Sequence, residues 1–194
     1  MLSPPPPTAH RGDPGAHPER AAGSAGAGPR PACGRTRANT LKAMSGYTVL
    51  RAADAFWRPS NATGVDNTDL GRQLGATTLG ARLWRLRPGQ TITRHRHREQ
   101  VELYVVLEGT GRIRVGQELL TLEPLSALLV QPRTLRQPFN DTDAEALWLI
   151  CGAPVEAANT LEMTAEQLAD LYPDGTTALP PELGGSDWPA APTS

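Results

Sequence analysis

The stretch GQTITRHRHREQVELYVVLEG, residues 89–109, decides the fold class and contains the candidate site. His95 and His97 are separated by one residue, so on an extended strand both imidazoles point to the same face. Glu102 follows on what we predict to be the neighbouring strand. Two imidazoles and one carboxylate on one side of a sheet form a ligand set that suits a mononuclear metal such as iron. The stretch therefore predicts a metal site.

The same stretch resembles the first motif of the cupin superfamily. That motif has a glycine, five residues, His-x-His, three or four residues, a glutamate, six residues and a second glycine. It is matched at Gly89, His95, His97, Glu102 and Gly109. The resemblance extends over about residues 47–152 and implies an all-β fold, a cupin-type antiparallel β-barrel (double-stranded β-helix or jelly roll). It also implies a site inside the barrel and, frequently, a homodimer.

The second cupin motif is matched only in part, and the mismatch falls on a ligand position. Pro124, Pro132 and Asn140 fit this motif, whereas Ser126 stands at its usual glycine. Arg136 stands where the family usually has the histidine that serves as fourth metal ligand, and a guanidinium cannot ligate a cation. Three placements of Arg136 stay open. It could form a bidentate pair with Glu102 in a metal-free barrel, bind an anionic ligand beside a metal, or lean out to solvent at the rim.

Strand alternation predicts which side chains face the interior. Over residues 91–98, His95 and His97 share one face with Thr91 and Thr93. The opposite face carries Arg94, Arg96 and Arg98, here called the arginine stripe, which we interpret as solvated or as paired with acids of a neighbouring subunit. Glu102 lies five residues after His97, so a turn or bulge near residues 98–100 is needed to bring it to the inner face, where Tyr104 follows it.

Composition limits the partners. The chain has 194 residues and a net charge of −1, which argues against nucleic acid and membrane surfaces as partners. No apolar run approaches the ~20 residues of a membrane span. Cys33 and Cys151 do not suggest a disulfide framework, and the expected location is therefore cytoplasmic.

We predict four segments along the chain. Residues 1–43 are rich in Pro, Gly, Ala and Arg and are expected to form a disordered tail. Met44 is a candidate start of translation, and an organelle transit peptide is the weaker alternative for the tail. Residues 44–155 form the barrel and 156–175 a C-terminal helix, for which Thr164 and Gln167 match a capping box. Residues 176–194 are expected to be a flexible tail.

Two classes of function fit these residues. In the first, His95, His97 and Glu102 hold a divalent Fe, Mn, Ni or Zn ion and a small molecule binds beside it, as in metal-dependent dioxygenase or isomerase cupins. Tyr104 is then the candidate for proton transfer. In the second, the barrel binds or senses a small ligand without metal and without turnover, with Arg136 paired to Glu102 or to an anionic ligand. A barrel kept only for dimerisation is a third alternative.

Overall fold

The structure is a computed structural model that describes residues 46–156 and 161–188. The disordered tail predicted for residues 1–43 lies outside these residues. The described chain contains nine strands and two short α-helices, α1 (Leu70–Leu74) and α2 (Ala165–Leu171), besides two 3-10 helices, η1 (Ala52–Asp54) and η2 (Pro181–Leu183). The strands are β1 (Arg58–Pro59), β2 (Asp66–Asp69), β3 (Gly80–Leu86), β4 (Val101–Glu108), β5 (Gly111–Val115), β6 (Glu118–Leu122), β7 (Ala127–Val130), β8 (Arg136–Phe139) and β9 (Ala146–Ala153).

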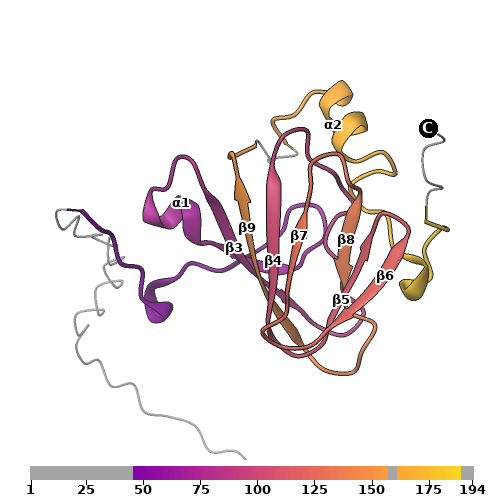
Figure 1. Ribbon diagram of the computed structural model, residues 1–194, viewed down its shortest axis with the longest axis horizontal. Helices are drawn as coiled ribbons and strands as arrows, with labels where there is room; N and C mark the ends of the chain where they lie inside the picture. Colours follow the sequence, from indigo (N-terminus) through magenta and orange to yellow (C-terminus); the bar gives the residue numbers. More distant parts are fainter. Residues whose placement is uncertain (1–45, 157–160, 189–194) are drawn as a thin grey trace, which may run out of the picture. The chain divides into compact units, whose positions relative to one another are not determined.

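The strands form two antiparallel sheets. The larger sheet has the order β1-β2-β3-β9-β4-β7 and the smaller sheet has the order β6-β5-β8. In the larger sheet β4 lies between β9 and β7, so that the strand carrying Glu102 is held on both sides (Figure 1). This all-β arrangement confirms the predicted jelly-roll fold.

Strand β4 follows the predicted alternation. Glu102, Tyr104 and Val106 are buried, whereas Leu103 is exposed. Tyr104 and Val106 join a core that also contains Trp148 of β9, whose side chain is fully buried. Each such aromatic residue removes a large apolar area from water, so this cluster stabilises the packing between the sheets.

The two glycines of the first motif adopt backbone conformations that favour glycine. Gly89 and Gly109 adopt φ values of +78° and +72°, where a side chain is strained. At Gly109 a Cβ would also lie 2.2 Å from the carbonyl oxygen of Glu145. The motif therefore marks the turns before residues 91–98 and after β4.

The segment over residues 91–98 departs from the prediction of a continuous strand. It is extended, but its backbone pairs with β8 through isolated bridges, Thr91 to Phe139 and His95 to Arg136. The backbone N–H of Arg133 also donates to the carbonyl of His97 at 2.8 Å. The alternation survives because these contacts keep the segment extended and antiparallel to β8, with His95 and His97 both buried.

The interpretation of the arginine stripe as a solvated or intersubunit face is wrong for this chain. Arg94 is fully buried and donates to the carbonyl of Leu179 at 2.8 Å, with its guanidinium 4.5 Å from the centre of the Trp188 ring. Arg96 and Arg98 pair with Asp170 at 3.0 and 2.6 Å. The chain's own C-terminal residues bury Arg94 and pair with Arg96 and Arg98, whose side chains stay partly exposed.

The C-terminal residues are ordered further than we predicted. Helix α2 begins at the predicted capping box, with reciprocal hydrogen bonds between Thr164 and Gln167. Beyond it, Glu182 of η2 pairs with Arg114 of β5. Residues 176–188 thus pack on the strands instead of forming a flexible tail.

The region before β3 contains more regular structure than its composition indicates. Residues 54–69 have a loop composition, yet β1 and β2 extend the larger sheet there and α1 follows directly. Short polar strands of this kind lack the apolar alternation that reveals strands in a sequence.

No helix among the described residues is long and apolar enough to cross a membrane.

Candidate metal centre

Three potential metal ligands converge on one point inside the fold. His95 and His97 come from the extended segment before β4, and Glu102 comes from β4 itself. One ligand atom from each residue lies within 4.8 Å of the others, and all three residues are buried. The bend at Arg98 and Glu99 brings Glu102 to the face of the two histidines, at the place where the sequence required a turn.

The hydrogen bonds of His95 leave one of its nitrogens available as a ligand. Its Nδ1 lies 2.9 Å from the carbonyl oxygen of Thr93, which can only accept, so Nδ1 carries the proton. The Nε2 atom then has a free lone pair, and it lies 3.8 Å from Glu102 Oε2. Burial lowers the pKa of His95, which favours the neutral imidazole that a metal requires.

The two oxygens of Glu102 have different neighbours. Oε2 accepts hydrogen bonds from Arg136 Nη2 at 2.8 Å, from Arg136 Nε at 3.2 Å and from the Tyr104 hydroxyl at 2.5 Å. Oε1 instead lies 3.1 Å from His97 Nε2. The pair with Arg136 therefore uses a single oxygen, not the bidentate geometry that we considered, and Oε1 stays turned toward the histidines.

The charges of this network are set by burial and by pairing. Burial alone would raise the pKa of Glu102, but the neighbouring imidazoles of His95 and His97 and the charge of Arg136 hold it well below its ordinary value. Burial, together with the charge of Glu102, raises the pKa of Tyr104 well above its ordinary value. At neutral pH Glu102 is therefore a carboxylate and Tyr104 a neutral phenol that donates to it.

Arg136 points inward. Its side chain is fully buried on β8, and besides Glu102 and Tyr104 it donates to the carbonyl of Thr134 at 2.8 Å. The alternative in which it leans out to solvent is therefore wrong. Its contact with an anionic ligand stays a prediction.

The three ligands suit a divalent cation. Metal–nitrogen and metal–oxygen bonds of about 2.1 Å place neighbouring ligand atoms about 3 to 3.5 Å apart. The 3.1 Å between His97 Nε2 and Glu102 Oε1 lies in that range, and one ligand atom from each of the three residues lies within 4.8 Å of the others. Because Arg136 and Tyr104 engage Oε2, the ligand oxygen that Glu102 offers is Oε1.

The candidate centre opens into a cavity of about 690 Å³. His95, His97, Glu102 and Tyr104 line one part of it, and residues of β1, β2, α1 and β3 line another. Three arginines lie among the latter, Arg58, Arg72 and Arg82. Arg82 pairs with Asp69 at 2.6 Å, whereas Arg58 and Arg72 form no ion pair with a described carboxylate.

The sequence reasoning missed two residues at the site, both beyond the last strand. Tyr172, at the end of α2, is buried against the cavity with its ring centre 6.1 Å from that of His95. Glu156 lies 3.6 Å from His97 Nδ1. Neither residue belongs to a motif with a characteristic spacing, so only the packing of the C-terminal residues reveals them.

Comparisons with known proteins agree with this geometry. The family model for the cupin domain matches residues 82–151, from β3 to β9. The chain belongs to the cupin superfamily. A solved structure from Silicibacter pomeroyi, described as a sugar phosphate isomerase from a cupin superfamily, is 27% identical to this cupin. The match covers 55% of this chain and 76% of that chain with a TM-score of 0.50.

Two further structures are more distant. A cupin protein from Bacteroides fragilis is 22% identical over 70% of this chain and 100% of that chain, with a TM-score of 0.48. A predicted oxalate decarboxylase from Thermotoga maritima is 17% identical over 55% of this chain and 99% of that chain, with a TM-score of 0.49. No curated protein matches the chain.

Proposed function

We propose that this cupin binds one divalent metal ion through His95, His97 and Glu102 and binds a small anionic molecule beside it. The observation that carries the proposal is the convergence of three buried ligand atoms at the wall of a cavity large enough for such a molecule. A bound metal would act as a Lewis acid toward an oxygen of that molecule. Mixed nitrogen and oxygen ligands leave Fe, Mn, Ni and Zn all possible.

The charges that line the cavity support an anionic ligand. Glu102 is neutralised by Arg136 and Asp69 by Arg82, while Glu156, the third acid of the lining, is bound by the backbone N–H groups of residues 98–100. Arg58 and Arg72 have no described acidic partner. A guanidinium binds phosphate or carboxylate with two parallel hydrogen bonds. The similarity to a structure described as a sugar phosphate isomerase favours a phosphorylated sugar as the ligand and isomerisation as the reaction.

The chain's own residues would have distinct tasks. Arg136 and Tyr104 both donate to Oε2 of Glu102. These hydrogen bonds keep the carboxylate ionised and fix its orientation. Tyr172 closes the cavity beside His95 with an aromatic ring that can pack against a sugar. Proton transfer by Tyr104 stays a prediction, and its raised pKa makes the phenol a hydrogen-bond donor or acid in preference to a base.

Titration calorimetry with the metal-loaded protein tests this proposal. We expect an aldose phosphate to bind at least about 10-fold more tightly than the same aldose without phosphate, and the double variant R58M/R72M to lose most of that difference. R51M, which removes an exposed arginine outside the cavity, is the matched control. Equal binding of the two sugars by the wild type would contradict a phosphate-binding role.

The alternative is a metal-free barrel that binds a small ligand without turnover. The close pair between Arg136 and Glu102 favours this alternative, because the guanidinium satisfies the buried carboxylate without a metal ion. In that case a metal chelator would leave the binding of the aldose phosphate unchanged. Under the metal proposal the chelator weakens it.

A homodimer and a cytoplasmic location stay predictions. Leu103 of β4 faces Leu129 of β7 across the sheet, and both side chains are exposed on its outer surface. Such an apolar pair on an outer strand is suited to contact with a second copy of the chain.

A further inference from the structure

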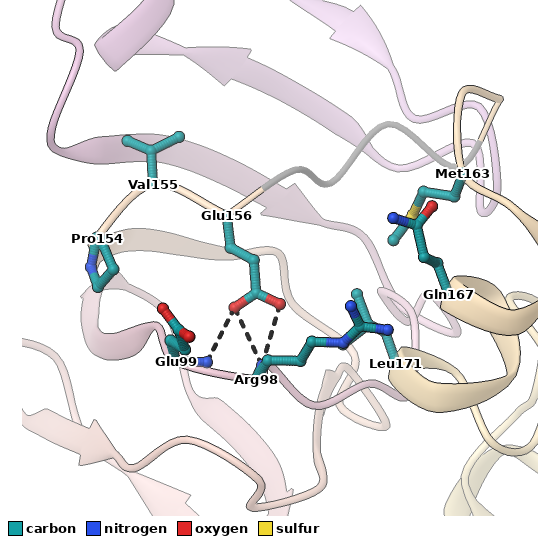
Figure 2. A pocket seen from close by; sticks show the side chains of 8 residues that line it. All are labelled: Arg98, Glu99, Pro154, Val155, Glu156, Met163, Gln167 and Leu171. Carbon is teal, nitrogen blue, oxygen red and sulfur yellow. Dashed lines mark hydrogen bonds between the residues drawn. The ribbon is translucent and has the colours of Figure 1, made fainter.

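Glu156 follows β9 and holds the turn between the candidate ligands His97 and Glu102. Its carboxylate accepts hydrogen bonds from the backbone N–H groups of Arg98 at 3.0 Å and Glu99 at 3.2 Å (Figure 2). The backbone N–H of Gln100 also donates to it, at 3.3 Å. Burial alone would raise the pKa of Glu156, but these backbone donors hold it below its ordinary value. A charged carboxylate therefore organises the bend that separates His97 from Glu102.

The same carboxylate faces the far side of the His97 ring. Glu156 Oε2 lies 3.6 Å from His97 Nδ1, and both side chains are largely buried. Nδ1 is buried and has no hydrogen-bond partner among the described residues. A buried polar nitrogen without a partner is costly, and Glu156 is the described acceptor within reach of a small side-chain rotation.

The position of Glu156 also changes the charge around the centre. Glu102 and Arg136 cancel each other, so the three ligands and Arg136 together carry no net charge at neutral pH when the histidines are neutral. Glu156 adds one negative charge on the outer side of His97. Electrostatic attraction for a divalent cation is therefore provided by a residue that is not a ligand.

We propose that Glu156 is a positioning residue for His97. It accepts the Nδ1–H of His97, which leaves the lone pair of Nε2 directed at the metal, and it holds the turn over residues 98–100 that places Glu102 beside Nε2. This inference rests on the metal site proposed above and adds a residue beyond the ligand set. Carboxylates that bond a ligating histidine typically change metal affinity 10- to 100-fold.

Two measurements on the full chain test the role of Glu156. Zn²⁺ dissociation constants are measured by chelator competition for the wild type, E156Q and E99Q. Glu99 is exposed in the same turn, so E99Q removes a nearby charge without touching His97. The second measurement is the exchange lifetime of the His97 Nδ1 proton in the Zn²⁺-loaded protein by NMR. We expect E156Q to bind Zn²⁺ about 10- to 100-fold more weakly and to exchange this proton faster, with E99Q like the wild type.

The outcomes separate this inference from the proposed function. If the wild type binds Zn²⁺ and E156Q matches it in affinity and proton exchange, Glu156 is not a positioning residue, while the metal site stands. If E156Q is only less stable to unfolding and its His97 proton exchanges as in the wild type, Glu156 serves the turn alone and the inference is wrong. A wild type that binds none of Zn²⁺, Mn²⁺, Fe²⁺ and Ni²⁺ overturns the proposed function and this inference together.

Discussion

At the scale of single residues, the two oxygens of Glu102 serve two purposes. Oε2 is held by Arg136 and Tyr104, while Oε1 faces His97. The arginine at the position of the usual fourth ligand therefore leaves Oε1 and the two imidazoles available to a metal ion. It replaces a ligand with a buried counter-charge that keeps Glu102 ionised.

This arrangement predicts a large cost for removing the arginine. In the metal-free protein, R136M leaves the Glu102 carboxylate buried without its counter-charge, and we expect the free energy of unfolding to fall by about 3 to 5 kcal/mol. Urea unfolding followed by circular dichroism measures it. The control is R133M, because the Arg133 side chain is 63% exposed, and we expect about 0.5 kcal/mol or less there. Equal effects of the two substitutions would contradict the buried pair.

Single residues also show where prediction from sequence succeeds and where it stops. His95, His97 and Glu102 could be identified because their spacing and the alternation of side chains act over a few residues. The direction of Arg136 could not be chosen among three alternatives, since it depends on the register of β8 against residues 91–98. Glu156 and Tyr172 reach the site only through tertiary packing, which no local pattern encodes.

At the scale of elements, the C-terminal residues act as a clamp on the segment that carries the histidines. Asp170 of α2 pairs with Arg96 and Arg98, which flank His97. The backbone N–H of Arg96 also donates to the carbonyl of Leu171 at 2.9 Å. We misread the arginine stripe because charged residues on an alternating segment are usually solvated, and their partners lie about 70 residues later in the chain.

A second contact of the C-terminal residues, between Glu182 of η2 and Arg114 of β5, is acid-sensitive. Hydrogen bonding to Arg114 lowers the pKa of Glu182, and both side chains are largely buried. A carboxyl with a lowered folded pKa stabilises the fold above its unfolded pKa, near 4.3, and loses this contribution as the pH falls through the folded pKa. We expect E182Q to reduce the unfolding free energy by about 1 kcal/mol at pH 7. The difference in unfolding free energy between the wild type and E182Q should shrink below about pH 4.

Chemical denaturation of the wild type and E182Q from pH 7 to pH 3 measures this difference. E118Q, at an exposed position of β6, is the control and should follow the wild type throughout. A difference between E182Q and the wild type that is constant over the whole pH range would show that the ion pair is not its cause.

At the scale of the whole molecule, the sequence was sufficient to predict the fold but not to predict its shortest strands. The first motif and the resemblance that it carries led to the jelly roll that the two sheets confirm. The strands β1, β2 and β8 escaped prediction because they are short and are recognised only by their pairing partners. The cavity is lined partly by β1, β2 and α1, so Arg58 and Arg72 could not be assigned to the site beforehand.

The metal content of the purified full chain, made without a histidine tag and measured by elemental mass spectrometry, tests the central claim most directly. The account predicts about one divalent metal ion per chain for the wild type and none for the variant H95A/H97A, which lacks two of the three ligands. A wild type that contains no metal after anaerobic incubation with Fe²⁺, Mn²⁺, Ni²⁺ and Zn²⁺, or a variant that retains the metal, would contradict it.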